Sequence, residues 1–209
     1  MSVLGPIITA SYAGNVQYYS KLAHYPQLVI DVYQHYEKQT LRNRCQIATA
    51  NGPMDLIIPV STNSGSKTID KDVRILNNGW QKLHWGALEA AYRHSPFFMY
   101  YEDDIRPFFQ QEYTFLLDFN LALQDSLMQL IGIAPQLTQS SCYVDAQADT
   151  IDLRNIVRVK KSIPDAQFGV VPYYQVFEQR HGFLPNLSIF DLLFNMGNES
   201  ILVLQQSVI

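Results

Sequence analysis

The chain has few charged residues. Asp, Glu, Lys and Arg make up 16% of its 209 residues, compared with about 25% in an average protein. The net charge is −4, so the chain lacks the basic surface on which general nucleic-acid binding depends. We therefore expect no nucleic-acid partner, although a local basic pocket is compatible with this balance.

Long apolar runs are also missing. No stretch reaches the roughly 18 apolar residues that predict a transmembrane helix. The first residues show neither a positively charged segment nor the apolar segment of a secretory signal. We therefore expect no membrane span and a cytoplasmic protein.

Metal-binding and catalytic signatures are sparse. The two cysteines, Cys45 and Cys142, have no CxxC or metal-ligand spacing, which favours two reduced, buried thiols over one disulfide. The five histidines show no HxxxH spacing, and acidic-x-acidic pairs are about as frequent as chance predicts. Neither a GxGxxG nor a GxSxG motif is present. We expect no metal site and no cofactor.

The first third of the chain has the pattern of alternating strands and helices. Residues 5–10 and 27–33 are short apolar runs typical of buried strands, and residues 16–25 between them are typical of a helix. A strand, a helix and a second strand within about thirty residues predict a βαβ unit with two parallel strands.

A hairpin is expected next. Residues 44–50 alternate between apolar and polar, and Asn51-Gly52 is a strong signal for a type I′ turn, after which residues 54–61 form the returning strand. Pro59 cannot donate to a β-ladder, so we expect an edge or a bulge at this position.

The second half is expected to be mainly helical. The apolar spacing and the Gly and Pro stop signals predict helices over residues 80–92, 111–132, 173–182 and 188–197. The polar residues 138–150 are expected to form a loop, and residues 72–76 one more strand. The prediction is a single α/β domain over residues 1–209, in which a mixed sheet (the βαβ unit and the hairpin) in the N-terminal half packs against helices.

Two segments are candidates for binding an anion. The loop that ends at Asn15 precedes a helix N-terminus, which favours negative charge, and Tyr12 would line the same pocket. Arg42, Asn43 and Arg44 form the second candidate, since alternation in a strand would place both arginines on one face. The alternatives are an ordinary turn for the first, and solvated charges or ion pairs for the second.

His84 is the candidate catalytic base. It falls within the apolar stripe of the helix expected over residues 80–92, where a half-buried imidazole can exchange a proton near neutral pH. The alternative is a core histidine with a satisfied hydrogen bond. Asp191, three residues after Ser188, is interpreted as part of a helix cap rather than as a catalyst.

Several stretches resemble the WbqC-like protein family. They are the tyrosine pattern Tyr12-x5-Tyr18-Tyr19, the run VIDV…RNRCQI…LIIPV, the segment WQKLHW with Tyr92 and Pro96-Phe97, and NLSIFDLLFNMG. The sequence departs from the family at Thr9, Ala10 and Gly14, where members usually have a glutamine–proline pair and a second proline.

The resemblance implies a place in surface-polysaccharide (O-antigen) synthesis and the transfer of a small group, but it supplies no established catalytic residues. We therefore expect a transferase that acts on a phosphate-bearing activated small molecule. In that mechanism Arg42, Asn43, Arg44, Tyr12 and Asn15 bind the substrate and His84 is the base. The alternative is a non-catalytic partner that binds a metabolite or a protein in a biosynthetic assembly. The sequence leaves the oligomeric state open.

Overall fold

The computed structural model describes residues 5–62, 68–146, 150–157 and 165–209. Strand β1 (Ile7–Ile8), helix α1 (Val16–His24) and strand β2 (Gln27–Ile30) form the predicted βαβ unit. The two strands are parallel, with Ile7 opposite Val29. Helices and strands alternate here, which confirms the α/β class.

A third parallel strand, β7 (Gln136–Gln139), pairs with the other side of β2 and gives the order β1-β2-β7. The sequence predicted a helix that ends before this strand and a loop that begins at residue 138. The strand escaped prediction because it is polar and largely exposed at the sheet edge, so it has no apolar pattern to detect.

The predicted hairpin is present as β3 (Arg44–Thr49) and β4 (Gly52–Ile57), and it forms a two-stranded sheet of its own. The turn is not of type I′. Gly52 has a positive φ, but Asn51 does not. The returning strand breaks before Pro59, after which β5 (Val60–Ser61) pairs with β6 (Arg74–Ile75). The strands therefore lie in three small sheets instead of one mixed sheet.

Helix α2 (Trp80–Tyr92) has the predicted bounds, and α4 (Leu116–Ile131) ends at Gly132 as predicted but begins five residues later than expected. Helix α6 (Ile189–Met196) is capped by Ser188. The expected helix over residues 173–182 is reduced to α5 (Glu178–His181). Besides β7, the elements of the described residues that were not predicted are α3 (Phe98–Ile105), α7 (Ser200–Gln206) and the 3₁₀ turns η1 (Asp70–Asp72), η2 (Arg106–Phe109), η3 (Arg154–Val157) and η4 (Gly197–Glu199).

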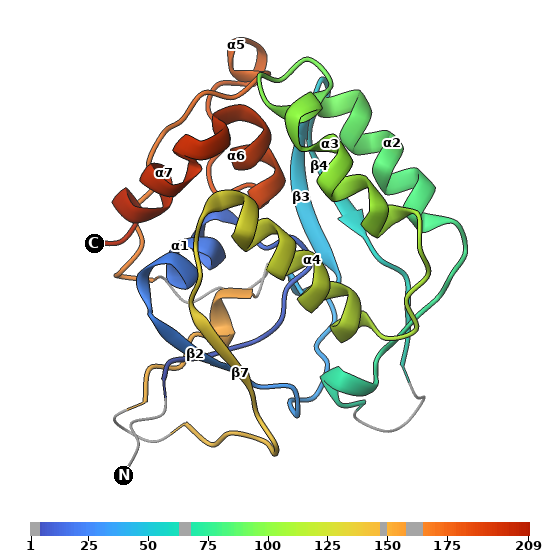
Figure 1. Cartoon of the computed structure of the whole chain (residues 1–209), viewed down its shortest axis with the longest axis vertical. Helices are drawn as coiled ribbons and strands as arrows, with labels where there is room; N and C mark the ends of the chain where they lie inside the picture. The colour runs from blue at the N-terminus through green and yellow to red at the C-terminus, as the bar shows by residue number, and fades with distance from the viewer. Residues whose placement is uncertain (1–4, 63–67, 147–149, 158–164) are drawn as a thin grey trace.

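The parallel sheet lies at one end of the molecule, and α2, α3 and the C-terminal helices lie toward the other end (Figure 1). Aromatic side chains fill much of the core between them. Trp80 packs edge-on against Phe119, and Phe190 stacks on Phe194. Rings of this kind bury a large apolar area, which explains how a chain with few charges forms a substantial core.

Two predictions about buried groups need correction. Cys45 is buried and free as expected, but Cys142 is free and exposed. Asp191 does not cap α6: its carboxylate is fully buried and accepts hydrogen bonds from Tyr92 Oη, Tyr173 Oη and Gln175 Nε2. Burial outweighs these donors and raises the pKa of Asp191 to about 6. Over the described residues, no helix is long and apolar enough to cross a membrane.

Candidate functional site

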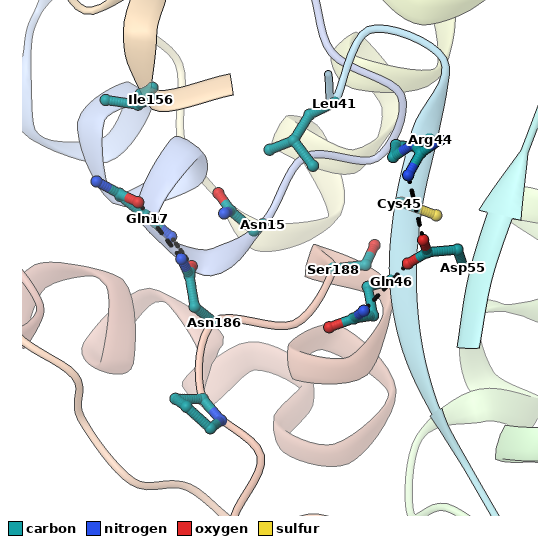
Figure 2. A pocket seen from close by; sticks show the side chains of 11 residues that line it. Asn15, Gln17, Leu41, Arg44, Cys45, Gln46, Asp55, Ile156, Asn186 and Ser188 are labelled. Carbon is teal, nitrogen blue, oxygen red and sulfur yellow. Dashed lines mark hydrogen bonds and ion pairs between the residues drawn. The ribbon is translucent and has the colours of Figure 1, made fainter. Parts of the chain in front are cut away.

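A cavity of about 260 Å³ opens between the start of α1, the segment before α6 and the β3–β4 hairpin. Figure 2 shows its lining side chains converging from these three parts of the chain. The lining is polar and apolar in about equal parts and consists of Asn15, Gln17, Leu41, Arg44, Cys45, Gln46, Asp55, Ile156, Pro185, Asn186 and Ser188. We call this space the Arg44 cavity.

Two helix N-termini meet at the Arg44 cavity. Asn15 caps α1, where its side-chain oxygen accepts from the backbone N–H of Tyr18, and Ser188 caps α6. The first residue of each helix also donates to the segment before the other helix: Val16 N donates to Leu187 O, and Ile189 N donates to Gly14 O. The helix dipoles therefore favour negative charge in the cavity, although these terminal N–H groups are already bonded within the protein.

The backbone beside the cavity adopts unusual conformations. Ala13 has a φ of 40° and Asn186 a φ of 56°, the left-handed region that residues with a side chain rarely occupy. The Asn186 side chain accepts from the Gln17 backbone and donates to the Gln17 side chain. Such conformations gather at binding sites, where surrounding contacts hold them in place.

Gly14 permits close packing in the turn between β1 and α1. A Cβ atom at this position would lie 2.7 Å from the Tyr18 ring and 2.9 Å from Ser11 Oγ. The turn between β1 and α1 can therefore pass directly over the Tyr18 ring only because residue 14 has no side chain.

Arg44 supplies the positive charge of the cavity. One of its terminal nitrogens lies 3.3 Å from Asp55 Oδ2, and the other Asp55 oxygen accepts from Gln46 Nε2 at 3.0 Å. The Arg44 Nε atom is buried and has no hydrogen-bond partner. Because Arg44 lines the cavity, its guanidinium can donate charge-assisted hydrogen bonds to an anionic oxygen there.

Arg42 does not join Arg44 at this cavity. Strand β3 begins only at Arg44, so the alternation of a strand does not extend back to Arg42, and the expected shared face does not exist. Arg42 Nε instead donates to Asp70 at 2.6 Å and its NH2 group to Gln34 at 2.8 Å. It lines a separate cavity of about 290 Å³, with Gln34, His35, Glu37, Tyr143, Asp152, Arg154 and Asn155.

Asn43 is buried and supports the backbone. Its side-chain nitrogen donates to Ile58 O, and its own backbone oxygen accepts from Ile58 N, both at 2.8 Å. This pair holds the segment between β4 and β5. The expected binding role of Asn43 stays a prediction, since its side chain lines neither cavity.

Tyr12 and His84 lie together in the core behind the Arg44 cavity. Tyr12 Oη and His84 Nδ1 are 2.9 Å apart, and burial lowers the pKa of His84 to about 4, despite a hydrogen bond to the Ile57 backbone. Both side chains are buried, and neither lines the cavity. Their binding and catalytic roles stay predictions, and any such role would have to act through the residues between them and the cavity.

Cys45 lies between the Tyr12–His84 pair and the Arg44 cavity. Its thiol lines the Arg44 cavity, and the hydroxyls of Tyr12 and Ser188 both lie close enough to bond to it. Burial raises the pKa of Cys45 to about 12, so the thiol stays protonated at neutral pH. It therefore lacks the thiolate character that a nucleophile needs.

Two of the cavity residues, Asn15 and Arg44, were predicted from the sequence as site residues. The other polar residues of the lining were not: Gln17, Gln46, Asp55, Asn186 and Ser188. The hairpin register could have revealed Asp55, because it pairs across the strands with Gln46, on the same side of β3 as Arg44. Among the described residues, no group of three or more His, Cys, Asp or Glu side chains is arranged to hold a metal ion.

The chain belongs to the WbqC-like protein family, which it matches over residues 10–168. It is also 26% identical to "Uncharacterized protein Rv1507c" of Mycobacterium tuberculosis (strain ATCC 25618 / H37Rv), in an alignment that covers 93% of this chain and 94% of that protein. No solved structure matches the chain. The family assignment agrees with the resemblance in the sequence.

Proposed function

We propose that the protein is a cytoplasmic transferase that binds a phosphate-bearing activated small molecule in the Arg44 cavity, in the synthesis of a surface polysaccharide (O-antigen). The observation that supports this proposal best is Arg44 itself. Its guanidinium has a buried Nε without a partner and lies at a cavity next to two helix N-termini. Charge-assisted hydrogen bonds from the guanidinium to a phosphate oxygen would hold the ligand there.

The size of the cavity limits the part of the substrate that it encloses. At about 260 Å³, it is smaller than the roughly 300–1,000 Å³ of typical ligand pockets. It suits the anionic group and a few neighbouring atoms, while a larger substrate would extend into solvent.

Calorimetric titration with uridine diphosphate and with inorganic phosphate tests the proposal. Hydrogen bonds to charged groups contribute about 1.5–3 kcal/mol, so we expect Arg44→Ala to weaken binding at least tenfold. Arg93→Ala is the matched control, because Arg93 is exposed just after the C-terminal end of α2 and pairs with Glu89. Equal affinity in the wild type and Arg44→Ala would refute an anion site at Arg44.

One observation favours the alternative, a non-catalytic binding protein. Of the side chains that line the Arg44 cavity, only Asp55 and the protonated Cys45 could take up or release a proton, and Asp55 is engaged with Arg44. The two functions differ in turnover. A transferase incubated with a metabolite extract should deplete a phosphate-bearing compound in an Arg44-dependent way, whereas a binding protein should return its ligand unchanged.

A further inference from the structure

The Arg44 cavity contains an acidic side chain at the position where an anionic ligand is expected. Asp55 Oδ2 lies 3.3 Å from Arg44, and Asp55 Oδ1 accepts from Gln46 Nε2 at 3.0 Å. Each oxygen of the carboxylate therefore has a donor, and all three residues line the cavity. Figure 2 shows Asp55 reaching from β4 across to Arg44 and Gln46 on β3.

We propose that Asp55 is an internal competitor for the ligand: its carboxylate occupies the anion position at Arg44, and the phosphate group displaces it on binding. This inference rests on the proposed function, because it concerns the affinity and regulation of the same site. It makes Asp55 a residue that sets the binding threshold of the cavity rather than a contact for the substrate.

The hairpin fixes the competing carboxylate in place. Gln46 and Asp55 are directly paired in the antiparallel ladder, so their side chains extend from the same face of the two strands. The register therefore keeps the carboxylate within reach of Arg44 whether or not a ligand is present. The local concentration of this competing carboxylate at Arg44 is therefore constant.

The pair of Arg44 and Asp55 is weak enough to be displaced. The two side chains are 19% and 36% exposed, and their separation is longer than the 2.7–2.9 Å or so of a strong charge-assisted hydrogen bond. Exposed pairs of this kind add little stability. By contrast, Arg42 and Asp70 are 2.6 Å apart, with side chains that are 5% and 10% exposed, so that pair would resist exchange.

The consequence is unusual for a residue that lines a binding site, because removing it strengthens binding. Asp55→Asn keeps the shape of the side chain and the hydrogen bond from Gln46, but it removes the negative charge. A phosphate ion would then meet a guanidinium without a charged competitor. From the contribution of exposed ion pairs, we expect inorganic phosphate to bind about fivefold more tightly.

Calorimetric titration with inorganic phosphate tests the inference. Asp55→Asn should bind about fivefold more tightly than the wild type, and Arg44→Ala/Asp55→Asn should lose this gain. The control is Asp103→Asn, an identical change of charge at an exposed position on α3, which should leave the affinity unchanged. Asp55 lies on a partly exposed strand, so circular dichroism should report an intact fold.

The outcomes separate the inference from the proposed function. If Asp55→Asn binds phosphate as the wild type does, or more weakly, while Arg44→Ala abolishes binding, the inference is wrong and the proposed anion site stands. If phosphate binds equally well with and without Arg44, or binds neither the wild type nor Asp55→Asn, both are wrong.

Discussion

Arg42 and Arg44 are two residues apart in the sequence but lie in contrasting environments. Arg42 is 4% exposed and is held by Asp70, Gln34 and Thr40. Arg44 is more exposed, has one long ion pair and retains a buried nitrogen without a partner. A buried arginine in a short ion pair stabilises the fold, whereas a more exposed arginine in a longer ion pair beside a cavity can bind a ligand.

Arg42→Ala should strongly destabilise the fold. It leaves the largely buried Asp70 carboxylate without its partner, and removing one member of a buried pair costs about 3–5 kcal/mol of unfolding free energy. Urea denaturation measures this loss. Arg42→Ala/Asp70→Asn should recover part of it, and a cost below about 1 kcal/mol would show that Arg42 does not stabilise the fold.

The pH dependence of stability tests whether His84, in the core behind the Arg44 cavity, stays neutral in the folded protein. Because burial lowers its pKa from 6.5 to about 4, the unfolded chain binds a proton at a higher pH than the folded chain does. Stability from His84 is therefore present above about pH 6.5 and is lost as the pH falls through 4, by about 3 kcal/mol in total.

His84→Gln removes this contribution, so the stability difference between the wild type and the variant should shrink between pH 7 and pH 4. Asp191 changes stability in the opposite direction: its pKa is raised to about 6, so its contribution is present at low pH and is lost as the pH rises through 6. Comparing the two proteins at each pH cancels the Asp191 contribution. A constant difference would contradict a buried, neutral His84.

Gly14→Ala tests the packing that shapes the rim of the Arg44 cavity. The added methyl group would lie 2.7 Å from the Tyr18 ring, and such overpacking costs about 1–3 kcal/mol. Gly86→Ala is the matched control, since a Cβ at this position in α2 meets nothing within 4 Å. In a helix interior that change should stabilise by up to about 1 kcal/mol. Thermal unfolding should therefore show shifts of opposite sign.

Arg44→Ala should have the smallest effect on stability, within about 1 kcal/mol, because partly exposed ion pairs contribute little. The same variant should lose phosphate affinity. We therefore expect a large change in binding together with a small change in stability. Urea denaturation beside the phosphate titration checks this. A stability loss as large as that of Arg42→Ala would mean that the two arginines do not differ in role.

Local sequence signals predicted the elements whose apolar pattern is strong. The βαβ unit, the hairpin and α2 follow directly from strand runs, Asn51-Gly52 and a 3.6-residue periodicity. Strand β7 and the short helices were missed because their residues are polar or few, and they are stabilised by neighbours rather than by their own pattern. The same limit applies to Asp191, whose spacing from Ser188 imitates a cap.

The sequence by itself determined the α/β class, the family, and an arginine-rich run placed just before a hairpin. It could not determine which of the two arginines has the weaker, more exposed ion pair, because strand β3 begins at Arg44 and Arg42 turns toward Asp70. Tertiary structure decided that question by bringing residues 15, 44, 55 and 186 to one cavity. The physical reason is that the availability of a charge depends on the partners that long-range packing places beside it.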